Sequence, residues 1–182
     1  MRIISGSLKG RRFSPPNGLP TRPTTDFAKE GLFNILQSNW DLDEVKYLDL
    51  FGGTGSLSME MFSRGCRDIT TVDNFDGCIK FIEKTCEEFG VDAIKLVKAD
   101  VFRFMENSKE QYDLIFAGPP YPLSNLAEIP DIVLENNLLN EEGWFIIEHS
   151  PEHNFDKHPN CFHHRNYGKT NFSIFRKKET EK

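Results

Sequence analysis

The sequence has no run of apolar residues near the roughly 20 that a helix needs to cross a bilayer. Its first residues, Met1 to Gly6, also lack the long apolar core of a secretory signal. We therefore expect a soluble, cytoplasmic protein with no membrane partner. A length of 182 residues suits one domain that can bury a substantial core.

Cysteine is sparse, and histidine is absent from the first 148 residues. The cysteines are irregularly spaced, without the Cys-x-x-Cys pair of a zinc or redox site, at Cys66, Cys78, Cys86 and Cys161. We expect free thiols in a reducing compartment. The five histidines form no helical His-x-x-x-His pair and have no neighbouring cysteine pair, so we predict no metal site.

The net charge of -6 does not by itself favour a nucleic-acid partner. Its distribution is uneven, because residues 1–30 carry six Lys or Arg against two acids, and residues 153–182 carry seven against three. Phosphate binding depends on local basic patches rather than on total charge. Two basic ends on an acidic middle are therefore compatible with RNA, although solvated tails are the alternative.

The chain is organised around a glycine-rich turn. An apolar run, Tyr47 to Phe51, predicts a buried strand, and Gly52-Gly53-Thr54-Gly55 separates it from an apolar-periodic segment starting at Ser56. Glycine permits close backbone approach to a ligand, and the N–H groups at a helix start favour anionic or polar groups. A nucleoside cofactor is the expected ligand, and a ligand-free turn is the alternative.

The acid Asp49 before this turn resembles the first motif of S-adenosylmethionine-dependent methyltransferases. A dinucleotide fingerprint fits less well, because its third glycine is Ser58 here. The second predicted strand, 69–73, ends in Asp73, at the place where nucleotide-binding folds put a carboxylate on ribose hydroxyls. After a third strand, 94–97, Asp100 is predicted to cap a short helix. In a methyltransferase it would also accept a hydrogen bond from the adenine amino group, and both roles stay open.

The second decisive stretch is Gly118-Pro119-Pro120-Tyr121, which follows a predicted strand at 112–117. The prolines restrict the backbone and leave their carbonyls without local donors, while Tyr121 offers a flat face. Such a corner can seat a planar base with an exocyclic amine. A plain Pro-Pro turn is the alternative, but parallel sheets bind ligands at this end of their strands, and we expect this corner to share one crevice with the glycine turn.

The remaining pattern predicts a doubly wound α/β sheet with parallel strands and right-handed crossovers. Residues 2–13 predict a small hairpin arm of two short strands that presents Lys9, Arg11 and Arg12 to a phosphate backbone. Thr25 or Asp26 is expected to cap a helix at 27–38. Further helices are predicted at 56–64, from 79 to a stop at Gly90, and at 128–137, and further strands at 144–148, 161–165 and 171–176.

At this point the chain resembles the bacterial 16S ribosomal RNA guanine-N2 methyltransferases, within the class I S-adenosylmethionine-dependent superfamily. The matching residues span nearly the whole chain: Arg2-Ile3-Ile4-Ser5-Gly6 with Lys9-Gly10-Arg11, Arg22-Pro23-Thr24-Thr25-Asp26 with Lys29-Glu30 and Leu32-Phe33-Asn34, Asp49 to Gly55, Ser63-Arg64-Gly65, Asp113 to Phe116 before Pro119-Pro120-Tyr121, Glu148-His149, and Tyr167-Gly168 with Thr170.

The resemblance implies a mostly parallel, seven-stranded, Rossmann-like sheet whose C-terminal hairpin contains an antiparallel strand. It implies one methyltransferase domain over residues 1–182, with a basic arm at 1–20 and a cofactor-binding core at 21–182, acting as a monomer. The implied cofactor is S-adenosylmethionine, and the implied partner is 16S rRNA or the assembling small ribosomal subunit.

The resemblance also implies the site residues. The implied catalytic corner is Gly118, Pro119, Pro120 and Tyr121. The implied cofactor site contains Arg22, Thr24, Asp49, Phe51, Gly52, Gly53, Gly55, Asp73, Asn74, Asp100 and Val101. The implied RNA contacts are Lys9, Arg11 and Arg12.

One position departs from the family motif Asp-Pro-Pro-Tyr, because Gly118 stands in place of the acid that accepts a hydrogen bond from the target amine. The alternatives are a catalytically weakened module that binds cofactor and RNA, a DNA adenine methyltransferase, and an NAD-dependent oxidoreductase. Glu148, at the end of the next strand, is the nearest acid by topology. Gly52 also stands where alanine is more usual, and we expect the turn to tolerate this substitution.

Overall fold

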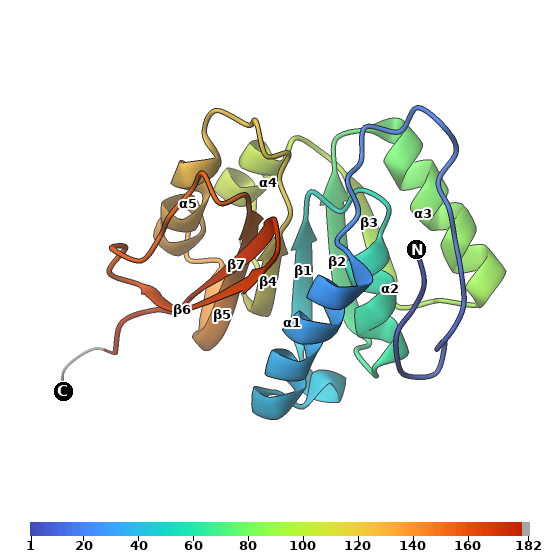
Figure 1. Ribbon diagram of the computed structural model, residues 1–182, viewed down its shortest axis with the longest axis horizontal. Helices are drawn as coiled ribbons and strands as arrows, with labels where there is room; N and C mark the ends of the chain where they lie inside the picture. Colours follow the sequence, from blue (N-terminus) through green and yellow to red (C-terminus); the bar gives the residue numbers. More distant parts are fainter. Residues whose placement is uncertain (180–182) are drawn as a thin grey trace.

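A seven-stranded sheet forms the middle layer of the fold (Figure 1). The computed structural model describes residues 1–179, so the last three residues of the predicted domain, 180–182, lie outside the described residues. The strands are β1 (Lys46–Leu50), β2 (Asp68–Asp73), β3 (Ile94–Lys98), β4 (Tyr112–Ala117), β5 (Leu139–His149), β6 (Cys161–Tyr167) and β7 (Thr170–Phe175).

The strand order is β3-β2-β1-β4-β5-β7-β6. Strands β1 to β5 pair in parallel, and β7 runs antiparallel to both β5 and β6. The predicted mostly parallel sheet with an antiparallel C-terminal hairpin is therefore confirmed. From β1 the chain builds outward through β2 and β3, then crosses over to β4 on the other side. This reversal leaves a crevice at the carboxyl ends of β1 and β4, where open α/β sheets bind ligands.

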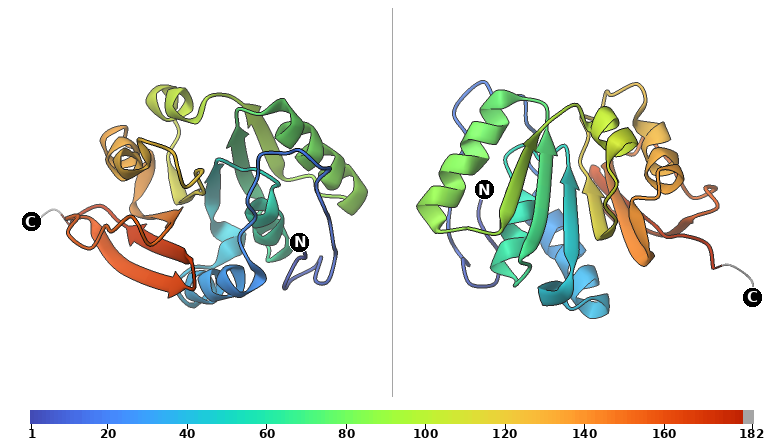
Figure 2. Two further views of the ribbon diagram at one scale, coloured as in Figure 1. Left: turned by 45° about the horizontal axis from the view of Figure 1, so that its top comes forward. Right: turned by 180° about the vertical axis from the view of Figure 1, so that it is seen from behind.

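Helices cover both faces of the sheet (Figure 2). They are α1 (Asp26–Asn39), α2 (Ser56–Ser63), α3 (Asp76–Phe89), α4 (Val101–Asn107) and α5 (Ile129–Glu135), with short 3-10 turns at Leu42–Glu44 and Leu126–Glu128. Successive side chains of β1 point to opposite faces of the sheet, so this one strand contributes to a hydrophobic core on each face. Tyr47 packs with α1 to α3, whereas Leu48 and Leu50 pack with α4 and α5. Within residues 1–179, no helix is long and apolar enough to cross a membrane.

The helix ends follow local chemistry. The Thr25 hydroxyl accepts a hydrogen bond from the Ala28 N–H at 3.2 Å, so Thr25 rather than Asp26 caps α1. At the end of α3, Gly90 takes the left-handed conformation with φ of 68°, as the sequence predicts. Strand β5 is longer than predicted, because residues 140–143, whose polar Asn-Glu-Glu-Gly pattern indicates a turn, continue it with a register shift against β4.

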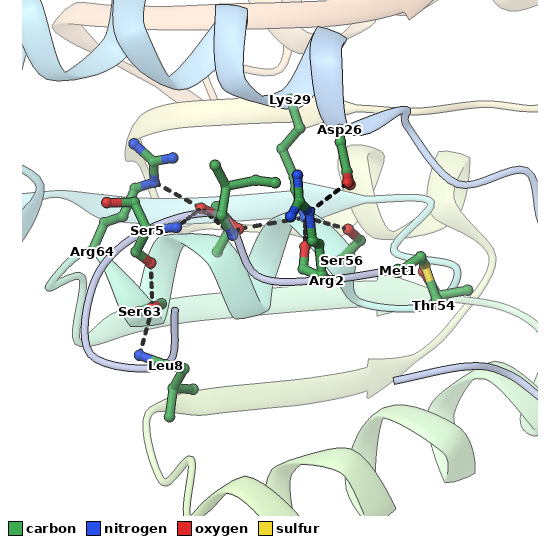
Figure 3. A network of polar contacts seen from close by, with 12 residues as sticks. Met1, Arg2, Ser5, Leu8, Asp26, Lys29, Thr54, Ser56, Ser63 and Arg64 are labelled. Carbon is green, nitrogen blue, oxygen red and sulfur yellow. Dashed lines mark hydrogen bonds and ion pairs between the residues drawn. The ribbon is translucent and has the colours of Figure 1, made fainter. Parts of the chain in front are cut away.

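The N-terminal arm folds back on itself as predicted, but a single bridge between Arg2 and Arg12 replaces the two expected strands. The reason is a carboxylate from another element: Glu60 of α2 accepts hydrogen bonds from the N–H groups of Ile4 at 3.0 Å and Ser5 at 3.1 Å. These donors therefore do not serve a cross-strand ladder. Figure 3 shows Lys29, one of the two cations beside Glu60, pointing toward this part of the arm; Arg64 is the other.

Candidate active site at the carboxyl edge of the sheet

A cavity of about 510 Å³ opens at the carboxyl ends of β1 and β4, a size typical of small-molecule sites. The glycine turn contributes Gly52 and Gly53, and the corner after β4 contributes Gly118, Pro119 and Tyr121. The two corners are tied together, since the Gly118 N–H donates to the Leu50 carbonyl at 3.2 Å. The two motifs expected at one crevice thus border the same cavity.

Asp73 holds the glycine turn in place. Its carboxylate accepts hydrogen bonds from the N–H groups of Gly53 and Phe75, each at 2.9 Å. A carboxylate has about four acceptor sites, so capacity remains for further donors. Asp73 and the exposed Asn74 both line the cavity, as does Phe75, an aromatic residue that the sequence analysis did not select.

Asp49 lies under the turn, fully buried, and its carboxylate accepts a hydrogen bond of 2.6 Å from the Ser58 hydroxyl. Burial raises the pKa of Asp49 from 3.8 to about 7; the Ser58 hydrogen bond opposes this rise and the charge of Asp73 adds to it. A carboxyl group that titrates near neutrality therefore lies directly beneath the turn.

This raised pKa predicts a pH dependence of stability. Between pH 3.8 and about 7 the folded state keeps a proton on Asp49 that the unfolded state has released. The free energy of unfolding should therefore fall as the pH rises through this window, by up to about 1.4 kcal/mol per pH unit, and level off above it. Urea unfolding of the wild type and Asp49→Asn at pH 5, 6, 7 and 8 checks this. Identical pH profiles for the two proteins would contradict the assignment.

The other glycines of the turn have different constraints. Gly55 does not border the cavity; it has φ of 77°, and a Cβ there would lie 2.9 Å from Ile82 of α3. At Gly52 this chain has no room for the more usual alanine. Its Cβ would collide with the methyl group of Thr71, whose hydroxyl lies 2.7 Å from Ser58 Oγ.

Two residues predicted at the adenine end lie outside the cavity lining. Asp100 is exposed and caps α4, accepting a hydrogen bond from the Arg103 N–H at 3.0 Å, and Val101 is buried in the core. The capping role is confirmed, and the adenine role stays a prediction. Phe51 does line the cavity, with φ of 58°. Such strain in a non-glycine residue is typical of functional sites.

Arg22 and Thr24, predicted to bind cofactor, line the cavity and contact the corner after β4 and the end of β5. The guanidinium carbon of Arg22 lies 3.4 Å from the centre of the Tyr121 ring. Arg22 Nη2 donates to Glu148 at 2.9 Å, and the Thr24 hydroxyl donates to the other carboxylate oxygen at 2.8 Å. Burial raises the pKa of Glu148, against the effects of the Thr24 hydrogen bond and the Arg22 charge. This segment closes one side of the cavity.

The basic residues of the arm are not part of the cavity lining. Lys9, Arg11 and Arg12 are exposed, and the neighbouring Leu8 N–H donates to Ser63 Oγ at the far end of α2, at 2.9 Å. Because α2 is eight residues long, that end is about 12 Å from the helix start at the cavity. Their RNA contact stays a prediction. Among residues 1–179, no group of three or more His, Cys, Asp or Glu side chains could hold a metal ion.

The fold is that of the Rossmann-like class I methyltransferases. The solved structure described as "Putative methyltransferase yhhF from Escherichia coli" is similar over 99% of both chains, with a TM-score of 0.84 and 24% identity. The chain belongs to the family described as Conserved hypothetical protein 95, which matches residues 1–176. The family resemblance predicted from the motifs is thereby confirmed.

Two relatives carry ribosomal RNA in their names. "Putative rRNA methyltransferase YlbH" from Bacillus subtilis is 34% identical over 161 residues, which cover 84% of each protein. "Ribosomal RNA small subunit methyltransferase D" from Escherichia coli K12 is 26% identical over 152 residues, which cover 84% of this chain and 76% of that protein.

Proposed function

We propose that this protein transfers a methyl group from S-adenosylmethionine to the exocyclic N2 of a guanine in 16S rRNA. The observation that carries the proposal is the single cavity shared by the glycine turn and the proline-tyrosine corner. The names of the relatives support rRNA as the substrate class. Action as a cytoplasmic monomer, with a basic arm at 1–20 and a core at 21–182, is part of the same proposal.

The residues on the β1–β2 side of the cavity fit the cofactor. Gly52 and Gly53 bring bare backbone to the cavity wall, and Asp73 has acceptor capacity left for the ribose hydroxyls. Phe51 and Phe75 offer apolar surface nearby. When bound, S-adenosylmethionine supplies an electrophilic methyl group.

The residues on the β4–β5 side fit the base. The Tyr121 ring can stack on a base, and the Pro119 carbonyl can accept a hydrogen bond from an amine. These contacts would hold the amine in position, which by itself supplies part of a rate enhancement. On gaining the methyl group the nitrogen would lose one proton, which would pass to water, because Gly118 has no side chain to interact with it.

The proposal is tested with methyl-labelled cofactor and small-subunit RNA from cells that lack this protein. Label should appear in guanine nucleosides after digestion, as N2-methylguanine. Cofactor binding without any transfer would instead favour a cofactor- and RNA-binding module, an alternative motivated by Gly118. Label in adenine, or transfer to DNA only, would favour an adenine methyltransferase.

Cofactor binding is expected to depend on Asp73. Asp73→Asn keeps one acceptor oxygen but replaces the other with a donor, which conflicts with one of the N–H groups of Gly53 and Phe75. The exchange also leaves one fewer acceptor for the ribose hydroxyls, a loss of about 1–3 kcal/mol, so calorimetry should show affinity for S-adenosylmethionine weakened by roughly 5- to 150-fold. Asp76→Asn, an exposed acid three residues later, is the matched control and should bind normally. Equal affinity in the two variants would contradict the role of Asp73.

A further inference from the structure

We propose that Glu148 and Tyr121 select guanine as the target base, and that Arg22 occupies the place of this base in the free protein. This inference rests on the proposed function, since it assigns the residues that choose the base. The inference gives a role to Glu148, which among the described residues is the buried carboxylate on the β4–β5 side of the cavity. Position 118, where the family has an acid, is a glycine in this chain.

The sheet places Glu148 beside Gly118. Strands β4 and β5 are parallel, and Ala117 pairs with Ile147, so the next residues, Gly118 and Glu148, are neighbours. Residues in register on adjacent strands project to the same face of a sheet. Glu148 therefore extends on the side where an acid at 118 would lie, and it lines the same cavity.

The contacts of Arg22 resemble those that guanine would make. Its planar guanidinium lies over the Tyr121 ring at 3.4 Å and donates a hydrogen bond of 2.9 Å to Glu148. In guanine, C2 carries N1–H, N2–H₂ and N3, which is the same planar arrangement of three nitrogens on one carbon. A base that replaced this guanidinium could stack on Tyr121 and donate from N1 and N2 to the Glu148 carboxylate.

This arrangement discriminates between purines. An ionised carboxylate only accepts hydrogen bonds, and guanine presents two adjacent donors on its N1–N2 edge. Adenine presents one donor, N6–H₂, next to an acceptor, N1. Its N1 lone pair would face a carboxylate oxygen and leave that buried oxygen unmatched. A site built around such hydrogen bonds rejects the wrong partner by roughly 10⁴-fold in favourable cases.

Exposure shows which of the two partners can move. The Arg22 side chain is 49% exposed, whereas the Glu148 side chain is 4% exposed. Arg22 can swing outward and keep its charge in water. Glu148 stays at the cavity wall, held by Thr24 and short of one donor partner, until a base supplies its N–H groups.

The first test is Glu148→Gln, assayed with labelled cofactor under single turnover, with guanine and adenine nucleosides separated after digestion. The glutamine amide offers one acceptor and one donor, which match adenine better than guanine. We expect guanine methylation to fall by about 100-fold and the guanine-to-adenine ratio of label to fall at least tenfold. Cofactor affinity should stay within about twofold, showing that the fold is intact. Glu142→Gln, an exposed acid on the same strand, is the control.

The second test is Arg22→Ala at pH 8. This substitution removes the guanidinium group that lies over Tyr121, where the base would bind. The KM for RNA should fall at least threefold. An unchanged or higher KM would overturn the role of Arg22, and an unchanged base ratio in Glu148→Gln would overturn that of Glu148. If the wild type methylates guanine but one of these roles is overturned, the proposed function still stands. No transfer by the wild type overturns both.

Discussion

Gly118→Asp is expected to raise the rate of methyl transfer to guanine by on the order of 100-fold, the size of the effect of one hydrogen bond made to a transition state. An exocyclic purine amine is a weak nucleophile because its lone pair is delocalised into the ring. A carboxylate that accepts one of its N–H groups favours the geometry of attack and the positive charge that develops on the nitrogen.

The backbone at position 118 can accept this side chain. A Cβ there would lie 3.1 Å from Cε1 of the Phe116 ring, so a shift of a few tenths of an ångström suffices. The φ angle is not in the left-handed region, and no strain is expected from the backbone. Cofactor affinity should stay unchanged, because Asp73 and the glycine turn are not altered.

Three variants separate the contributions at this position. Gly118→Asn supplies a neutral acceptor and should give a smaller gain, while Gly118→Ala supplies none and should give no gain. Initial rates are measured at saturating cofactor with RNA from cells lacking the protein. If Gly118→Asp binds cofactor normally and transfers no faster than Gly118→Ala, the acceptor role assigned to this position is wrong.

The second large effect is expected at Glu60, in the buried charge network that anchors the arm. Glu60 is fully buried; its carboxylate lies 2.9 Å from Arg64 Nε and 3.4 Å from Lys29 Nζ, and both of those side chains are also buried. Glu60→Gln keeps the shape but leaves two buried cations without their anion. Breaking a buried ion pair from one side costs about 3–5 kcal/mol.

Urea unfolding should show this loss as a lower midpoint with an unchanged slope. The arm should also become susceptible to proteolysis within residues 1–20, because the Ile4 and Ser5 N–H groups lose a charged acceptor. Glu141→Gln, which breaks an exposed pair with Lys177, is the control and should cost less than about 1 kcal/mol. A loss below about 1 kcal/mol for Glu60→Gln would show that the network is dispensable.

Much of the site was predictable because it is local in the sequence. The turn of Gly52 and Gly53 follows an apolar strand, and Pro119 and Tyr121 follow another, so their place at the carboxyl edge comes from strand and turn patterns alone. The role of Asp100, predicted to contact adenine, was less predictable. Asp100 matches the expected spacing, but its side chain is used by the backbone of α4, since an acid at a helix start caps the helix whether or not a ligand is present.

The amino-acid sequence by itself determined the order of strands and helices, the turns and the family, since these depend on residues within a few positions of one another. Only the tertiary structure decided which side chains meet at the cavity and in the buried charge network. Arg22 meets Glu148 across 126 positions of sequence, and Lys29 meets Glu60 across a helix-to-helix interface. No local pattern specifies such partners, because a charged side chain looks the same in the sequence whether it lies in water or is buried against its counter-ion.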